Sequence, residues 1–269
     1  MKFEAPPQWT TDFLHHGMFE DLNRLFNLHQ FDKWPSLDWL NQHAVGIKNK
    51  NDKQITFVAN DDIDWQHGYY EEIIYDKGDI PTRLENWHDL FGAFIWLLFP
   101  KTKALLNALH IEQINLHGRA ERSKKRNAIT LLDECGVIIV CDITQASRLQ
   151  NHGWVEGFFD NRDDWFESVW PFMFGHANYE MATRPYLGLT GKALYITAHH
   201  DELPSSLSEK YAWLDTTLEK LIEQQDILCD NSNLYPLPLL GVPTWYAQNT
   251  EKTFYENTEY FRPKRRKSK

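Results

Sequence analysis

Cysteine is scarce in this sequence of 269 residues. The three cysteines, Cys135, Cys141 and Cys229, are odd in number and lack the C-x-x-C spacing of zinc sites and thiol oxidoreductases. The first ten residues, MKFEAPPQWT, contain no apolar stretch of the kind that forms a signal peptide. Reduced thiols without a leader are typical of a reducing compartment. We therefore expect a cytoplasmic protein whose cysteines are unpaired.

Long hydrophobic runs and the common catalytic motifs are also missing. The longest apolar run, Leu90 to Phe99, is far shorter than the roughly 20 residues that cross a bilayer, so we expect no membrane span. We find no glycine-rich phosphate loop, no G-x-S-x-G and no H-E-x-x-H. These absences disfavour nucleotide-cofactor enzymes and zincins.

Basic residues are fewer than acidic ones, 28 against 38, so the formal net charge is −10. Such a charge argues against nucleic-acid binding by the body of the protein. The exception is a basic C-terminal tail, residues 263–269, which we predict to be disordered and to be the only segment suited to contact nucleic acid. The hydrophobic content of 42% and aromatic content of 14% supply a core for one globular domain over residues 1–262. The sequence makes no prediction of oligomeric state.

Hydrophobic periodicity and capping residues predict mostly helix. Strands are expected at 55–58, 137–140 and 193–197, where β-branched and aromatic residues cluster. Helices are expected at about 10–29, 36–46, 69–75, 87–99, 101–110, 118–134 and 206–225. A short helix capped by Thr144 and a longer one at about 165–181, which Pro171 should kink or break into two pieces, are also expected. The proline-rich stretch 235–243 is expected to be an extended, irregular arm. The fold class is therefore α+β, helix-dominated, in a single domain with a small sheet of about three strands.

The most concentrated polar signal is the segment Arg83-Leu84-Glu85-Asn86-Trp87-His88-Asp89, directly before the apolar run. Asn86 suits the N-cap of the helix, and Asp89 suits its first turn, where acids complement the helix dipole. His88 has no such structural reason, because a cation is disfavoured at a helix N-terminus. We expect a neutral imidazole with a lowered pKa, suited to bind a metal ion or act as a base. The alternative is a salt-bridge and capping cluster that only pins the Pro81 turn.

Three arginines are spaced along the predicted helix 118–134. Arg119, Arg122 and Arg126 fall on one face, with Asp133 further along the same stripe. Arginines in a row suit a phosphate or carboxylate, although a solvated face would look the same. Asp133 and Glu134 end this helix, where the dipole disfavours acids, and such local conflicts gather at functional sites.

His176 and Glu180 form a further pair. They are spaced four residues apart in a predicted helix, so both could bind one metal ion or contact each other. A surface pair without a function is the alternative.

Several ordered motifs resemble one known family. Ile80-Pro81-Thr82-Arg83, Asn86 to Phe91, Phe99 to Lys103, Arg126 to Glu134, Phe174 to Ala177 and Pro236 to Gly241 together resemble the bacterial domain-of-unknown-function family 3025. The resemblance extends from about Gly68 to Arg262 and implies membership but no activity. Gly92 stands where the family pattern has Asn, and Asn127 where it has Asp.

The leading functional hypothesis is that the protein is an enzyme or a binding protein with one polar pocket. In the enzymatic version it is a metal-assisted hydrolase with a divalent ion as cofactor and a small anionic substrate, such as a phosphoester. The expected catalytic residues are His88, Asp89, Asp133 and Glu134. The expected binding residues are Arg83, Glu85, Asn86, Arg126 and His176. The alternative is a non-enzymatic binding or interaction protein whose polar cluster is structural.

Overall fold

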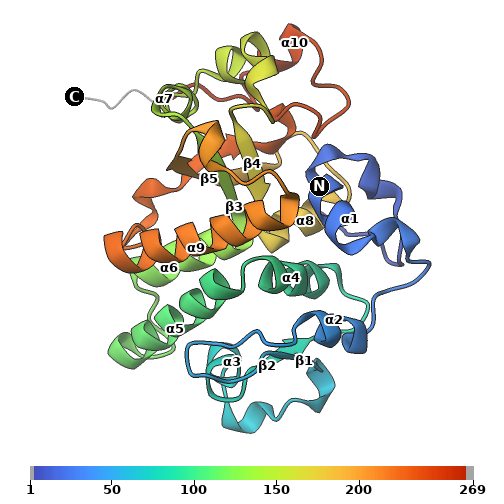
Figure 1. Ribbon diagram of the computed structural model, residues 1–269, viewed down its shortest axis with the longest axis vertical. Coiled ribbons are helices and arrows are strands. Elements are labelled where there is room, and N and C mark those ends of the chain that lie inside the picture. The colour runs from blue at the N-terminus through green and yellow to red at the C-terminus, as the bar shows by residue number, and fades with distance from the viewer. Residues whose placement is uncertain (1–2, 265–269) are drawn as a thin grey trace.

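A computed structural model describes residues 3–264 and has a helix-dominated α+β fold, as the sequence predicts (Figure 1). A four-stranded sheet lies in one half of the molecule, with α7 (Ile143–Gln150) and α10 (Lys252–Tyr255) beyond it, and a two-stranded sheet lies near the opposite end. Between the two sheets are the helices α4 (Trp87–Leu98), α5 (Pro100–His117), α6 (Lys124–Cys135) and α9 (Leu207–Gln225). The predicted tail lies almost entirely outside the described residues. Among helices of residues 3–264, none combines the length and the apolarity needed to cross a membrane.

The larger sheet has the strand order β4-β3-β5-β6. Its strands are β3 (Gly136–Cys141), β4 (Trp170–Met173), β5 (Thr190–Thr197) and β6 (Tyr235–Pro238). β3 is buried at every position and pairs in parallel with β5, which confirms the expectation that the apolar run 137–140 is a central strand. β4 and β6 are antiparallel to their neighbours.

The helices that border the site are α4 (Trp87–Leu98), α5 (Pro100–His117), α6 (Lys124–Cys135) and α8 (His176–Ala182). α4 packs on α8, and α6 packs on both α5 and α8. α4 is apolar nearly all round and is buried accordingly. The remaining helices are α1 (Glu20–Phe26), α2 (Leu37–His43), α3 (Tyr70–Lys77), α7 (Ile143–Gln150), α9 (Leu207–Gln225) and α10 (Lys252–Tyr255).

The two-stranded sheet pairs β1 (Thr56–Ala59) in parallel with β2 (Asp79–Thr82). α3 connects the strands and ends at Gly78, which has a φ of 84° and donates its N–H to Ile74. A Cβ at Gly78 would lie 2.1 Å from the carbonyl oxygen of Gln54, so only glycine fits there. β2 therefore delivers the segment from Arg83 to Asp89 to the start of α4.

Three predicted elements were wrong, each where glycine or proline interrupts the pattern. The helix expected over residues 10–29 is instead two 3-10 turns, Asp12–His15 and Gly17–Phe19, followed by the short α1. The helix expected at 165–181 is strand β4 and then α8, because Pro171 lies in the strand and Gly175 ends the connection. The helix expected from residue 118 begins only at Lys124, since Gly118 ends α5 with a φ of 80°.

Two local predictions also need correction. The proline-rich arm contains regular structure: its residues 235–238 form β6, the edge strand of the sheet, where a missing N–H is tolerated. The N-cap of α7 is Asp142, two residues before the expected Thr144, because its carboxylate accepts hydrogen bonds from the N–H groups of Thr144 and Gln145.

Candidate metal centre

The polar segment before α4 forms a compact ion-paired turn. The Asn86 side chain accepts from the N–H of Asp89 and caps the helix as predicted. The Asp89 carboxylate accepts from the backbone N–H of Arg83 at 2.7 Å and from its Nε and Nη2 at 2.9 and 2.8 Å. Glu85 is exposed with a φ of 53°, and neither Glu85 nor Asn86 lines the cavity described below. Arg83 and Asp89 therefore neutralise each other at the rim of that cavity.

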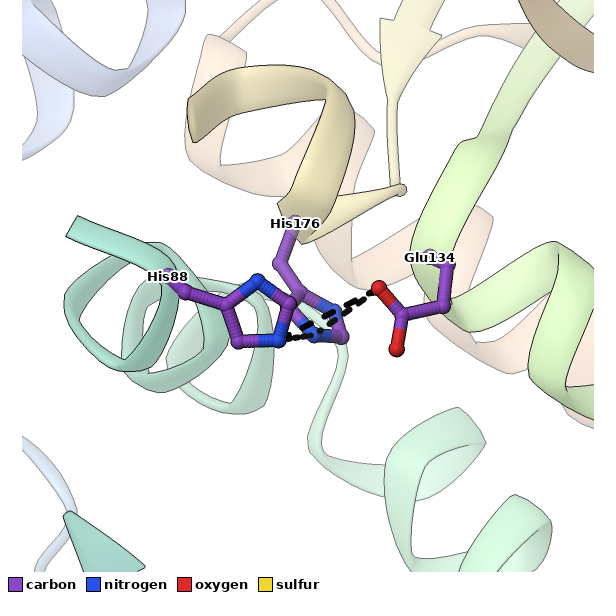
Figure 2. A group of neighbouring side chains, drawn as sticks. All are labelled: His88, Glu134 and His176. Atoms are coloured by element: carbon purple, nitrogen blue, oxygen red, sulfur yellow. Dashed lines mark hydrogen bonds and ion pairs between the residues drawn. The ribbon is translucent and has the colours of Figure 1, made fainter. Parts of the chain in front are cut away.

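Three helices bring His88, His176 and Glu134 together (Figure 2). The Nε2 atoms of the two imidazoles lie 3.1 Å apart. An Oε2 atom of Glu134 lies 3.7 Å from Nε2 of His176 and 4.0 Å from Nε2 of His88. Among the side chains that the structure describes, this is the one cluster of histidine, cysteine or carboxylate groups with the spacing of a metal site.

The outer nitrogen of each imidazole already has an acceptor. Nδ1 of His176 lies 2.7 Å from the carbonyl oxygen of Asp133, and Nδ1 of His88 lies 3.1 Å from Oε2 of Glu180. A carbonyl or carboxylate can only accept, so both Nδ1 atoms carry hydrogen. In the neutral tautomers both Nε2 atoms then present lone pairs to each other. This arrangement requires a proton or a cation between them.

The two histidines have opposite electrostatic environments. The hydrogen bond to Glu180 raises the pKa of His88 in spite of its partial burial, and the charges of Glu134 and Glu180 add to the effect. Burial lowers the pKa of His176, which is 8% exposed. The expectation of a lowered pKa at His88 was therefore wrong, because the hydrogen bond to Glu180 and the charges of nearby carboxylates outweigh the effect of burial. Without a metal ion, a proton on His88 can bridge the two Nε2 atoms.

Gly175 explains how His176 reaches this position. A Cβ at Gly175 would lie 2.5 Å from the carbonyl oxygen of Glu134, so the start of α8 touches the end of α6. The N–H of Gly175 bonds to Gly136, and the Asn178 side chain donates to the carbonyl of Cys135. These contacts fix His176 beside Asp133 and Glu134.

A cavity of about 260 Å³ opens beside the cluster. Its lining includes Arg83, His88, Asp89, Arg126, Asp133, Glu134 and His176, seven of the nine predicted site residues. Four carboxylates, Glu71, Asp89, Asp133 and Glu134, face four cationic side chains, Arg83, Lys103, Arg122 and Arg126. With neutral histidines the formal charge of the lining is therefore zero, and a divalent ion would make it positive.

Asp133 acts through two different groups. Its carbonyl orients His176, while its side chain pairs with the buried Lys103 at 2.5 Å. Burial alone would raise the pKa of this carboxyl, but the charges of Lys103 and His176 hold the pKa below its usual value. Asp133 is therefore an ionised partner of Lys103, and it contributes to the cluster through the carbonyl that orients His176.

The arginine stripe predicted on one helix does not exist. Arg119 and Arg122 lie in the connection before α6, and only Arg126 is helical. Arg119 pairs with Glu72 outside the cavity, and Arg122 donates to Thr130. The predicted contact between His176 and Glu180 is replaced by the contact of Glu180 with His88, since α8 packs on α4.

Among the acidic, basic and histidine side chains of the cavity lining, three were missed in the sequence: Glu71, Lys103 and His110. The sequence indicated Lys103 and His110 only weakly, because both are polar residues at buried positions of α5. Glu180 was paired with the wrong histidine. Of the two departures from the family pattern, Gly92 lines the cavity next to His176, whereas Asn127 is exposed.

The comparisons with known proteins give one match. Residues 55–265 match a family described as protein of unknown function (DUF3025). The search of curated proteins and the search of solved structures give no match. The matched range contains every residue of the cluster and of the cavity lining.

Proposed function

The chain belongs to the DUF3025 family of proteins of unknown function, and we propose that it is a hydrolase of a small anionic substrate, such as a phosphoester, in which His88, His176 and Glu134 would hold a divalent metal ion that activates water. The observation that carries the proposal is the pair of imidazoles whose Nε2 atoms face each other at 3.1 Å while both Nδ1 atoms donate elsewhere. Acceptors on the outer nitrogen are typical of metal-bound histidine.

The distances suit one ion. Two nitrogens that bind one ion at about 2.1 Å lie about 3.0 Å apart in octahedral and about 3.4 Å apart in tetrahedral coordination. The observed distance between the two Nε2 atoms, 3.1 Å, falls in this range. The Glu134 carboxylate is more distant, at 3.7 and 4.0 Å, but its side chain is 37% exposed and can rotate inward. Two histidines and one carboxylate leave coordination positions open for water and substrate.

Hydrolysis follows from the chemistry of such an ion. A bound divalent metal lowers the pKa of its water toward neutrality and polarises a phosphoryl or carbonyl oxygen. The positive lining that an ion would create favours an anionic substrate, and the side chain of Arg83 at the rim is 56% exposed. Asp133 and Glu180 orient the two imidazoles and do not themselves bind the ion.

Metal analysis of the purified protein tests the proposal, together with zinc and manganese titrations of the metal-free form. His88→Ala and His176→Ala should weaken binding by more than about 100-fold, since loss of an outer-shell partner alone costs about 10- to 100-fold. His117→Ala, at an exposed position that ends α5, is the matched control. Hydrolysis of a general phosphoester probe should require the ion and proceed without oxygen.

The structural alternative makes the opposite prediction. If the cluster only locks α4, α6 and α8 together, His88→Ala lowers the melting temperature strongly and no metal binds to the parent protein. Wild-type protein that binds no divalent ion in either titration refutes the metal centre.

A further inference from the structure

Arg126 is a buried guanidinium whose charge has no carboxylate partner. It is 2% exposed and lines the same cavity as the metal cluster. Among residues 3–264, no acid lies within ion-pair distance of it. A buried charge without a counterion is costly, so its retention requires a compensating group.

The hydrogen bonds of Arg126 are confined to one corner of the guanidinium. Nη1 donates to the carbonyls of Gly118, Arg119 and Glu121 at 3.4, 3.2 and 2.8 Å and so orders the connection before α6. Nε is buried without a partner, and Nη2 makes no hydrogen bond within the described chain. The Nε–Nη2 edge is the one that grips an oxyanion with two parallel bonds.

A second unsatisfied group lines the same cavity. His110 on α5 is 7% exposed, and its Nδ1 is buried without a partner in the described chain. Its Nε2 lies 3.9 Å from Glu71. Arg122 adds a guanidinium that donates to the hydroxyl of Thr130 and forms no ion pair with an acid of the described chain.

The spacing along α6 separates these groups from the metal cluster. Arg126 lies seven residues before Asp133 and eight before Glu134, which corresponds to about 10 to 12 Å along a helix. Thr130 lies between them on the same helix and also lines the cavity. A ligand that spans this cavity would thus have two polar ends.

We propose that Arg126, His110 and Arg122 form a receptor for an oxyanion, either phosphate or carboxylate, and that Arg126 lies about 12 Å along α6 from Glu134 of the metal cluster. This inference rests on the proposed function, because the distance describes the substrate only if hydrolysis takes place at the metal cluster. The substrate class is then a small molecule that carries an anionic group at the end opposite to the bond that is hydrolysed. This end group supplies the counterion that Arg126 lacks.

Titration of the metal-free protein tests the receptor, with inorganic phosphate in one arm and acetate in the other, by calorimetry or by imidazole NMR shifts. Saturable binding is expected in one arm, and that arm identifies the end group. His110→Phe should weaken it about 10-fold, since a hydrogen bond to an ion is lost. Arg126→Lys, which keeps the charge but loses the fork, should also weaken it. Arg119→Gln, an arginine from the same connection outside the cavity, should leave it unchanged.

Several outcomes overturn the inference. Wild-type protein that binds neither anion does so, and so does equal binding by wild type and His110→Phe. If Arg126→Lys fails to fold, His110→Phe and Arg122→Gln still decide the matter. Failure here is distinct from failure of the metal centre: a protein that binds zinc but neither anion keeps the proposed function and loses the receptor. His88→Ala should lose the ion and retain anion binding.

Discussion

Glu180 provides the sharpest test of how the metal cluster is supported. Its carboxylate accepts a hydrogen bond from Nδ1 of His88 at 3.1 Å. Glu180 does not belong to the group of side chains spaced to bind the ion, which is His88, Glu134 and His176. If His88 binds an ion through Nε2, Glu180 fixes the ring and increases its basicity. Replacing Glu180 therefore weakens metal binding without removing a ligand.

The magnitude depends on the substitution. Glu180→Gln keeps an oxygen acceptor but removes the charge, so we expect about 10-fold weaker zinc binding, equivalent to about 1.4 kcal/mol. Glu180→Ala removes the acceptor as well, and we expect about 100-fold, or about 2.8 kcal/mol. The assay is competition with a zinc chelator of known affinity.

A matched control separates this effect from a general loss of charge. Glu156→Gln removes an exposed carboxylate that pairs with Arg148 beside α7, away from the cavity, and should leave zinc affinity unchanged. Zinc affinity that is equal in wild type and Glu180→Ala would refute the assignment of Glu180 as the residue that orients His88.

Four further predictions concern stability and reactivity. Asp215 accepts the N–H groups of Lys101 and Thr102 in the first turn of α5, so Asp215→Ala should cost about 2 to 4 kcal/mol in the free energy of unfolding; a melting curve like that of wild type contradicts this. Gly92→Ala places its Cβ 3.8 Å from His176, an ordinary contact, and should stabilise α4 by up to about 1 kcal/mol with unchanged zinc affinity; a lower melting temperature would show that the cavity wall is tighter. Lys103→Met and Asp133→Asn should each destabilise the protein, and the double variant should be more stable than additivity predicts, by about 1 to 3 kcal/mol; strict additivity in denaturant unfolding would show that the pair is not coupled. Burial raises the pKa of Cys141 to about 12, so this thiol should resist a disulfide reagent at pH 8 until the protein unfolds, while the exposed Cys229 reacts at once; rapid labelling of Cys141 in the folded protein contradicts its burial.

Local chemistry explains which elements were predictable. Asn86 and Ser206 cap α4 and α9 with their own side chains, and Gly78 ends α3 with a left-handed backbone. Each of these features depends on a few neighbouring residues. β3 could also be predicted without knowledge of its neighbouring strands, because it is apolar along its whole length. β4 was missed because Trp170 to Met173 is a short apolar run, whose periodicity does not separate strand from helix. Its pairing with β3, distant in sequence, decides the matter.

By itself, the sequence determined the α+β class, the helix that begins after Asn86 and the set of acids, histidines and arginines worth testing. Only the tertiary structure decided which of them meet. The packing of α4 on α8 turns Glu180 toward His88, and the contact of Gly175 with α6 places His176 beside Glu134. The pKa of His88 is raised by those two carboxylates, which are distant in the sequence, because charges and hydrogen bonds act through space between packed helices. The same holds for Arg126, whose missing counterion is a property of its buried surroundings and not of its neighbours in the chain.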